Sequence, residues 1–351
     1  MKVLVIGGSA FMGRGVVETF LKEQHEVSIL NRGKTPDPFG NKVKRILVSD
    51  RNDREAFRNA LKSAGNVNVC VDFSAYIPSH VTDVLTVLHG KVGHYIFIST
   101  QAVYQSPFWD KKKKVVEDET YMLQIPQKNR TSYGWDKRGC EELLISSYTT
   151  GGFPSTRVRI PIINGANDPT YRLWRYHSWL KSKQPIYLTA SENIEGYSCL
   201  WSEDVVRGIM KIIKAGSKTF GEVYNFSQNE RPHPLKVFKI MASTNKYPNN
   251  NNGNDDKLVR ILSKDMLKHL TKNEIRKLRG WSFLDGMDAS LSIEKAKNEL
   301  NWEPTKMELF YPKIVDWFET GESDLDTSKA PFNDTKLMEK LDKLYNSNSK
   351  V

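Results

Sequence analysis

Short apolar runs alternate with stretches of helical periodicity through the first 160 residues of the chain. The runs have the length and the β-branched content of buried strands, and in the stretches between them apolar residues recur every three or four positions. Repeated strand-helix units predict an α/β fold with a doubly wound parallel sheet, which binds ligands at the carboxyl ends of its strands. The predicted strands are Val3–Ile6, Glu26–Leu30, Val43–Val48, Val67–Phe73 and His94–Ile98, and the predicted helices are Val16–Glu23, Asp53–Ala64, Ser79–Leu88 and one that opens at Tyr133.

The first strand runs into a glycine-rich turn within the stretch Lys2–Gly15. At the start of a helix, unpaired backbone N–H groups and the helix dipole hold a pyrophosphate, provided that no side chain blocks its approach. Gly7 and Gly8 give the tight turn, and Gly13 lets the helix pack closely on the strand. The alternative is an ordinary turn, but the strand before it and the helix after it favour a dinucleotide site.

The second strand ends in Asn31, Arg32, Gly33 and Lys34, about 20 residues after the turn. A ribose-reading Asp or Glu is expected there in an NAD site, and it would repel a 2′-phosphate. The two cations therefore favour NADP, with NAD as the alternative cofactor. A solvated basic loop is the plainer interpretation of the same residues.

Polar residues also follow the later strands of the predicted sheet. We expect Asp50 and Arg51 near the adenine, Ser74 to Tyr76 near the ribose and pyrophosphate, and Ser99 with Thr100 near the reacting ring. Each of these residues has an alternative role in a turn or a helix cap.

Tyr133 and Lys137 lie four residues apart at the start of a predicted helix, which places both on one helical face. Hydride transfer at a carbon that carries oxygen requires a proton to move as well. A tyrosine can move that proton near neutral pH if its phenolate is stabilised, and an adjacent lysine ammonium beside an oxidised nicotinamide would stabilise it. Such a pair is common on helix surfaces, and it becomes specific when it is joined to the glycine turn and to Ser99 and Thr100.

Three segments of the sequence resemble the motifs of the extended short-chain dehydrogenase/reductase family, and within it the NAD(P)-dependent sugar-nucleotide epimerase/dehydratase group. The segments are 7–13 (GGSAFMG), 99–104 (STQAVY) and 133–137 (YGWDK), and further likeness extends to about residue 320. The resemblance implies a Rossmann-type fold and a catalytic set of Thr100, Tyr133 and Lys137. In this set Tyr133 would be the acid/base, Lys137 its electrostatic partner and a ribose ligand, and Thr100 the hydroxyl that polarises the substrate oxygen.

The resemblance also implies contacts for the two ligands. The expected cofactor-binding residues are Gly7, Gly8, Ala10, Phe11, Met12, Gly13, Asn31, Arg32, Lys34, Asp50, Arg51, Phe73, Ser74, Ala75, Ser99, Tyr133, Lys137 and Pro161. The expected substrate-binding residues are Tyr76, Arg172, Trp174 and Arg175, of which the last three suit anions and ring stacking. The expected substrate is a nucleotide sugar or a related hydroxyl or carbonyl compound.

Two departures from the family pattern limit the activity. Ala10 replaces the middle glycine of the turn, which would narrow access to the phosphates. Gln101 and Ala102 stand where the sugar dehydratases of this group carry Asp and Glu, which argues against a 4,6-dehydratase.

Two further function classes remain open. The Gly-Gly-x-x-Phe start together with Asn31, Arg32 and Gly33 also resembles chloroplast stem-loop RNA-binding proteins, and Lys111–Lys114 could contact RNA phosphates. A solvated loop explains that lysine run as well. The other class is a regulator that senses NADPH without turnover, although such a protein would not need all three catalytic residues.

The predicted organisation is a dinucleotide-binding domain over residues 1–165, a smaller mixed substrate-binding part over 166–320 and a polar tail over 321–351. Residues 197–230 would return to the first domain. The asparagine-rich stretch 245–257 has the composition of a disordered insertion. Ser263 and the pair Thr271 and Glu274 predict helix caps, and leucines at helical spacing predict a helix over Thr335–Tyr345 that docks on the body or on a neighbouring subunit.

Composition narrows the partners. The 351 residues carry a formal net charge of +11, which suits anionic partners such as nucleotides, nucleotide sugars or RNA. Cys70, Cys140 and Cys199 are isolated, which predicts neither disulfides nor a metal site. With a strand from residue 2 and no long apolar run, we expect a cytoplasmic protein without a membrane partner, and a homodimer is one expected state.

Overall fold

The computed structural model describes residues 1–36, 38–48, 50–104, 114–117, 132–182, 184–189, 196–244, 246, 259–282, 290–320 and 334–348. The chain forms two compact units, which are described separately here. Unit 1 comprises residues 1–163, 200–229 and 289–304, and unit 2 comprises residues 164–199, 230–288 and 305–351.

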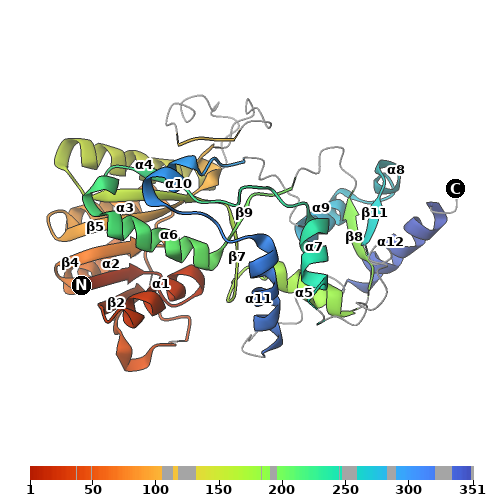
Figure 1. The fold of residues 1–351 in the computed structure, drawn as a ribbon, viewed down its shortest axis with the longest axis horizontal. Helices are drawn as coiled ribbons and strands as arrows, with labels where there is room; N and C mark the ends of the chain where they lie inside the picture. The colour runs from red at the N-terminus through yellow and green to blue at the C-terminus, as the bar shows by residue number, and fades with distance from the viewer. Residues whose placement is uncertain are drawn as a thin grey trace. The chain divides into compact units, whose positions relative to one another are not determined.

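Unit 1 is built on a seven-stranded sheet in which every neighbouring pair of strands is parallel. The strand order is β10-β6-β5-β4-β1-β2-β3, so the chain leaves the central β1 in one direction and returns on its other side with β4 (Figure 1). The strands are β1 (Lys2–Ile6), β2 (Glu26–Asn31), β3 (Lys44–Leu47), β4 (Val67–Asp72), β5 (Val92–Thr100), β6 (Ser155–Ile160) and β10 (Val223–Asn225). The predicted Rossmann-type fold is confirmed, and its switch point lies between β1 and β4.

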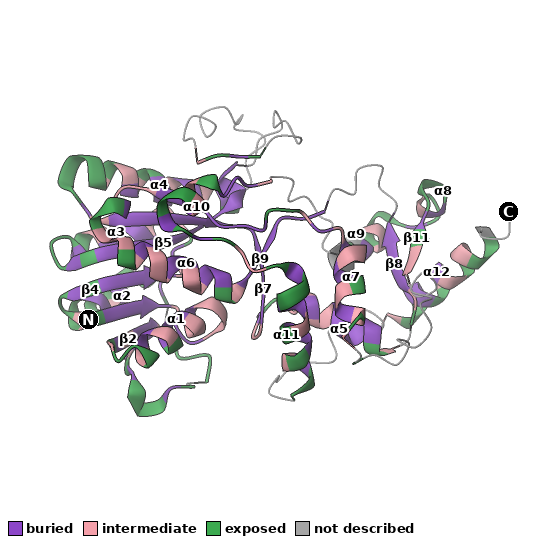
Figure 2. Cartoon of the chain, in the orientation of Figure 1, coloured by how far each residue is buried: buried purple, intermediate pink, exposed green. Residues whose placement is uncertain are grey.

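Helices cover both faces of this sheet. One face packs against α1 (Phe11–Lys22), α6 (Ser202–Ala215) and α10 (Glu294–Leu300). The other packs against α2 (Arg54–Ala64), α3 (Pro78–Leu88) and α4 (Ser132–Gly151). Figure 2 shows the consequence: the strands are buried, and the outer faces of the helices are exposed. This double cover explains why the strands read as continuous apolar runs.

Five shorter elements complete unit 1 or lead out of it. The 3-10 turns are η1 (Gly40–Lys42), η2 (Gln101–Tyr104) and η5 (Gly216–Thr219). The strands β7 (Ile162–Asn164) and β9 (Cys199–Trp201) form a separate two-stranded ladder where the chain passes between the two units.

Unit 2 contains a parallel pair of strands, β8 (Ile186–Thr189) and β11 (Val259–Leu262), together with six helices among its described residues. The helices are α5 (Arg172–Ser182), α7 (Pro234–Ala242), α8 (Lys264–Leu267), α9 (Lys272–Ser282), α11 (Met307–Glu319) and α12 (Thr335–Asn348). The predicted tail helix is present as α12. Its Leu337 and Leu341 are buried, and its Asp342 accepts a hydrogen bond from the Tyr187 hydroxyl on β8 (2.5 Å).

The predicted helix caps are confirmed in unit 2. The Ser263 hydroxyl accepts from the Met266 N–H at the start of α8. Thr271 and Glu274 form a reciprocal capping box before α9, with each side chain accepting from the main-chain N–H of the other residue. The predicted disordered stretch 245–257 lies outside the described residues except for Lys246.

Several boundaries differ by a few residues from the sequence prediction, and the differences at α1 and β5 concern predicted site residues. Helix α1 begins at Phe11, within the glycine turn, because the turn is tighter than the periodicity suggests. Strand β5 is longer than predicted and extends to Thr100, which brings Thr100 into the ladder with Ile160 of β6. No helix among the described residues has the length and apolarity that a membrane crossing requires.

Candidate functional site

The glycine turn between β1 and α1 is tight at two positions. Gly7 adopts φ +87°, a conformation that favours glycine, and lies beside Phe73 at the end of β4. A Cβ added to Gly13 would approach the Gly7 carbonyl oxygen to 2.2 Å, so this helix residue must also be glycine. The turn therefore brings the start of α1 against the β1 end at the switch point of the sheet.

The start of α1 is open to an anion. Ala10 occupies the N-cap position and offers no side-chain acceptor, and the main-chain N–H groups of Phe11, Met12 and Gly13 have no acceptor within the described chain. These unpaired donors, at the positive end of a 12-residue helix, fit a pyrophosphate. Ala10 has an extended backbone (φ −140°), so the turn itself does not require glycine there, and the expected narrowing of access by its side chain stays a prediction.

Phe11 carries the strain of this turn. Its φ of +47° is unusual for a bulky residue, and its side chain packs on the core beside α1. Strain of this kind is held in place by surrounding packing and gathers at ligand sites.

The end of β2 lies beside the same turn. The Asn31 side chain donates to the Ser9 hydroxyl (2.5 Å) and accepts from the Gly33 N–H, which fixes the loop that carries the two predicted cations. Arg32 and Lys34 are exposed. The main-chain N–H of Asn52 chiefly lowers the pKa of the exposed Asp50, and the charges of Arg32 and Lys34 lower it further, so their fields reach the loop after β3.

Sequence reasoning missed Arg45 on β3, whose guanidinium also donates to the Ser9 hydroxyl, over 3.5 Å. It lies beside Ile29 of β2 in the strand register, two residues before Asn31. The period of two along a strand could have indicated that it shares a sheet face with Asn31.

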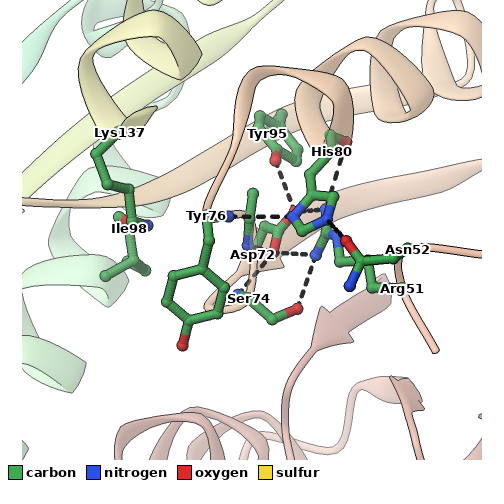
Figure 3. A network of polar contacts seen from close by, with 10 residues as sticks. Arg51, Asn52, Asp72, Ser74, Tyr76, His80, Tyr95, Ile98 and Lys137 are labelled. Carbon is green, nitrogen blue, oxygen red and sulfur yellow. Dashed lines mark hydrogen bonds and ion pairs between the residues drawn. The ribbon is translucent and has the colours of Figure 1, made fainter. Parts of the chain in front are cut away.

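The loops after β3 and β4 are joined by a buried ion pair (Figure 3). The Arg51 guanidinium donates to both Asp72 carboxylate oxygens (2.8 and 2.7 Å) and to the Ser74 hydroxyl (2.7 Å). Although burial alone would raise it, the pKa of Asp72 is lowered by Arg51 and by the Ser74 N–H. The Arg51 guanidinium is buried and paired with Asp72, and its expected contact with the adenine stays a prediction.

Asp72 also shapes the turn that follows β4. One carboxylate oxygen accepts from the Ser74 and Ala75 N–H groups, and the other accepts from the Tyr95 hydroxyl. Next in the chain, the Tyr76 N–H donates to His80 Nδ1 (3.2 Å). This polar framework leaves the Tyr76 side chain half exposed at the carboxyl end of the sheet.

Thr100, Tyr133 and Lys137 come together at the end of β5 and the start of α4. The Thr100 hydroxyl hydrogen-bonds the Tyr133 phenol, which is 44% exposed and therefore accessible to a ligand. The Lys137 ammonium, one helical turn further on, is 2% exposed and donates to the Ile98 carbonyl over 2.6 Å. The Tyr76 ring lies 6.4 Å from the Tyr133 ring, measured between centroids.

Burial shifts the pKa of both titratable groups in this set. Burial raises the pKa of Tyr133 above its usual value, and the hydrogen bond from Thr100 opposes that rise without reversing it. Burial lowers the pKa of Lys137 to about 8. Lys137 is not among the groups that shift the Tyr133 pKa in the chain by itself, and the expected stabilisation of the phenolate by Lys137 beside an oxidised nicotinamide stays a prediction.

A second buried network connects the end of β5 with α4 and β6 and was missed in the sequence. The Ser99 hydroxyl donates to the Glu141 carboxylate, which also receives the Arg159 guanidinium of β6. Arg159 donates in addition to the Tyr104 hydroxyl (2.7 Å). Glu141 follows Lys137 by four residues on α4, and that spacing could have indicated it. The Ser99 hydroxyl belongs to this network, and the expected contact of Ser99 with the cofactor stays a prediction.

The remaining predicted cofactor residues keep positions near strand ends. Met12 is half-buried in the first turn of α1, Gly8 and Ala75 are buried, and Pro161 is buried between β6 and β7. Their contacts with a cofactor stay predictions.

Unit 2 carries the predicted substrate residues on α5. The Arg172 guanidinium donates to the Thr170 hydroxyl (2.8 Å) and lies 3.9 Å from the Asp168 carboxylate. Arg175 makes no hydrogen bond or ion pair through its side chain within the described chain, and burial together with the Arg172 charge lowers its pKa. The indole N–H of Trp174 is buried without an acceptor.

Two other predictions fall partly outside the structure. Lys111–Lys113 lie outside the described residues, whereas Lys114 is exposed. The three cysteines are buried and free, and the described residues contain no cluster of metal-ligating side chains.

Comparison with known proteins decides the family. Residues 3–226 match the NAD dependent epimerase/dehydratase family, a span that contains the glycine turn, Thr100, Tyr133 and Lys137. The chain belongs to this family. Its resemblance to the sugar-nucleotide epimerase/dehydratase group is thereby confirmed.

Solved structures share the fold of this epimerase/dehydratase family member. A dTDP-glucose 4,6-dehydratase from Bacillus anthracis, solved with NAD, has a TM-score of 0.69 at 18% identity and covers 92% of this chain and 97% of its own. A UDP-glucuronic acid 4-epimerase from Bacillus cereus, solved with UDP-glucuronic acid and NAD, has a TM-score of 0.67 at 16% identity, with coverages of 91% and 99%. At these identities the likeness establishes the fold alone.

A curated relative of this chain carries a name of a different kind. The chloroplast stem-loop binding protein of 41 kDa b from Arabidopsis thaliana is 25% identical over 316 residues, which span 86% of this chain and 75% of that protein. Family membership therefore leaves both an enzymatic and an RNA-binding role to be weighed.

Proposed function

We propose that this protein is an NADP-dependent reductase or epimerase that acts on a nucleotide sugar. The observation that carries the proposal is the hydrogen-bonded pair of Thr100 and Tyr133 beside the buried Lys137. An accessible phenol bonded to a hydroxyl, one helical turn from an ammonium, suits proton transfer to or from a substrate oxygen. A purely binding protein has no need of this arrangement.

Thr100, Tyr133 and Lys137 have different roles in the proposed reaction. When bound, the nicotinamide cofactor supplies a hydride donor or acceptor and, in its oxidised form, a positive charge. Tyr133 gives or takes the proton at its phenol oxygen, and Thr100 orients the same substrate oxygen by a hydrogen bond. Lys137 contributes a fixed positive charge and a donor for ribose hydroxyls. Since the phenol of the free protein has a raised pKa, Tyr133 begins the reductive direction protonated and ready to act as the acid.

The unpaired N–H groups of Phe11 to Gly13 would hold the cofactor pyrophosphate. Arg32 and Lys34, exposed beside the Asn31–Ser9 hydrogen bond, would bind a 2′-phosphate, whereas an NAD site would be expected to place an acidic residue there. These charges support NADP over NAD. The structural relatives solved with NAD supply the competing choice.

A nucleotide diphosphate is the substrate part that suits unit 2. Arg175 is half-buried without a side-chain partner, and its charge is repelled by that of Arg172. A dianion bound between the two guanidinium groups would offset both the desolvation of Arg175 and this repulsion. Trp174, on the same helix, offers an unpaired indole N–H. The relative solved with UDP-glucuronic acid has a ligand of this class.

The decisive experiment combines cofactor binding with turnover in purified full-length protein. We expect NADPH fluorescence to report tighter binding than NADH, and a panel of UDP- and dTDP-sugars with NADP or NADPH to reveal one substrate by nicotinamide absorbance or by epimerised product. Tyr133→Phe should then lower turnover by about a hundredfold or more, because it removes the proton-transfer group, and leave the NADPH dissociation constant nearly unchanged.

Tyr148→Phe serves as the matched control, because Tyr148 is an exposed tyrosine on the same helix α4. It should change neither quantity. Full turnover in Tyr133→Phe would contradict the assigned mechanism, and a wild-type protein that binds neither pyridine nucleotide would contradict the proposed function.

RNA binding is the second candidate, favoured by the name of the Arabidopsis relative and by the net charge of +11. Its test is binding of a labelled stem-loop RNA across a salt series, with Lys111–Lys114 changed to Gln. Specific affinity that is lost in this variant but kept in Tyr133→Phe, with no turnover of any nucleotide sugar, would favour RNA binding over the enzyme.

A further inference from the structure

The Lys137 ammonium is buried among unusual partners. It donates one hydrogen bond, to the Ile98 carbonyl over 2.6 Å, and makes no further hydrogen bond within the described chain. Two aromatic rings lie close to the charge: Nζ is 4.6 Å from the ring centre of Phe97 and 5.2 Å from that of Tyr76. Figure 3 shows Lys137 beside Ile98, with Tyr76 on the neighbouring loop.

No carboxylate is free to act as a counter-ion for this ammonium among the described residues. Asp72 and Glu141 raise the pKa of Lys137, but each is already bound to a buried arginine, Arg51 and Arg159 respectively. The Arg51 charge lowers the pKa of Lys137, and Cys140, the remaining titratable neighbour, raises it. Part of the cost of burying the charge must therefore be offset by the faces of the two rings.

The two rings are not equivalent. Phe97 is fully buried in the sheet, whereas Tyr76 is half exposed in the loop after β4. That loop is held firmly, because Asp72 accepts from its N–H groups and the Tyr76 N–H donates to His80 Nδ1. The His80 Nε2 is in turn hydrogen-bonded to the Asn52 side chain (3.0 Å). Tyr76 is thus a fixed ring on the solvent side of the ammonium.

We propose that Tyr76 is a positioning residue whose ring covers the Lys137 ammonium and holds it against the Ile98 carbonyl, beside Tyr133. The ring would exclude water from the charge and supply a cation–π contact, so that Lys137 keeps one orientation before a ligand arrives. The role adds to the substrate contact expected of Tyr76 and requires its ring but not its hydroxyl. It deepens the proposed function, in which Lys137 serves the cofactor and Tyr133.

The test is the titration of Lys137 itself, followed by NMR in full-length protein with lysine labelled at the ε-carbon and assigned by Lys137→Arg. Wild-type protein should titrate near the pKa of about 8. Tyr76→Ala removes a cation–π contact, which by itself would lower the Lys137 pKa, but it also lets water reach the ammonium. Because burial is the largest cause of the lowered pKa, hydration should dominate and raise the Lys137 pKa by about one unit, tenfold in proton affinity. Tyr76→Phe keeps the ring and should titrate like the wild type.

NADPH binding gives the second readout. Tyr76→Ala should weaken NADPH binding by about tenfold because Lys137 is no longer held in place, and Tyr76→Phe should restore it. A Lys137 pKa that is unchanged in Tyr76→Ala, or raised equally in Tyr76→Phe, would overturn the inference. The titration needs no dinucleotide, so failure of the wild type to bind NADPH would count against the proposed function and leave the Tyr76 inference standing.

Discussion

At the scale of single residues, the structure separates side chains that serve ligands from those that serve the fold. Tyr133 is accessible and Thr100 reaches it, whereas Arg51 and Ser99, which also follow strands, are committed to buried carboxylates. The side chain of a polar residue at a strand end is therefore available to a ligand only where it is not already bonded to a buried charged group. His94 of β5 illustrates the structural kind, because its Nε2–H donates to Thr156 Oγ1 (2.7 Å), which donates onward to a carbonyl.

We expect His94 to make stability depend on pH. Burial lowers its pKa from 6.5 to about 4, so the unfolded chain takes up this proton first as the pH falls. Neutral His94 therefore adds about 3 kcal/mol to the free energy of unfolding above pH 6.5, and this stabilisation is lost as the pH falls towards 4. Chemical denaturation between pH 7 and 4 should show a shallower decline in the free energy of unfolding for His94→Gln. His269→Gln, at an exposed position, is the control, and equal slopes in His94→Gln and the wild type would contradict the assignment.

At the scale of elements, the glycine turn and the first turn of α1 together form one structure suited to binding an anion. The turn is tight because Gly13 touches the Gly7 carbonyl, and that closeness is what leaves the first N–H groups of the helix unobstructed at the switch point. The helix gains no side-chain cap at Ala10, so it forgoes the stabilisation of a capping residue. An anion that occupies the helix start would restore it.

The close packing of this turn predicts different effects for alanine substitutions at two glycines of α1. In Gly13→Ala the new Cβ would meet the Gly7 carbonyl oxygen at 2.2 Å, so we expect a loss of about 2 kcal/mol in stability and a large loss of NADPH binding. In Gly15→Ala the new Cβ meets only the Val206 side chain, at 3.0 Å, and stability should be unchanged or slightly higher. Thermal unfolding and NADPH titration of both variants check this, and similar behaviour of the two would refute it.

At the scale of the whole molecule, buried ion pairs connect elements that are distant in the sequence. The pair of Arg51 and Asp72 joins the loops after β3 and β4, and the pair of Arg159 and Glu141 joins β6 to α4, with Ser99 of β5 as a third member. Such pairs are costly to bury and costly to break. Ser99 shares β5 with Thr100, and Glu141 shares α4 with Lys137, so the second pair fixes the end of β5 relative to α4.

Breaking one of these pairs should destabilise unit 1 far more than breaking a surface pair. Glu141→Gln leaves the buried Arg159 without its counter-charge, and we expect a loss of about 3–5 kcal/mol in the free energy of unfolding. Glu18→Gln removes the exposed i,i+4 pair with Arg14 and should cost about 0.5 kcal/mol or less. Urea denaturation of both variants provides the measurement, and losses of similar size would show that the buried network adds little.

The sequence by itself determined five of the seven strands of the sheet, the glycine turn and the spacing of Tyr133 and Lys137. These features depend on local chemistry: apolar runs make buried strands, glycines allow tight turns, and residues four apart share a helical face. The helix caps at Ser263 and Thr271 were predictable for the same reason, since each involves residues within one turn.

Tertiary structure alone decided which polar residues remain available. Arg51 and Asp72 are 21 residues apart, and Ser99 and Glu141 are 42 apart, so no local pattern announces that they meet. The direction of the Lys137 ammonium, towards Ile98 and the Tyr76 ring, likewise depends on three elements packed together. Burial then shifts the pKa values of Tyr133, Lys137 and His94. Desolvation depends on how the whole fold packs around each group, so no single segment of the sequence predicts it.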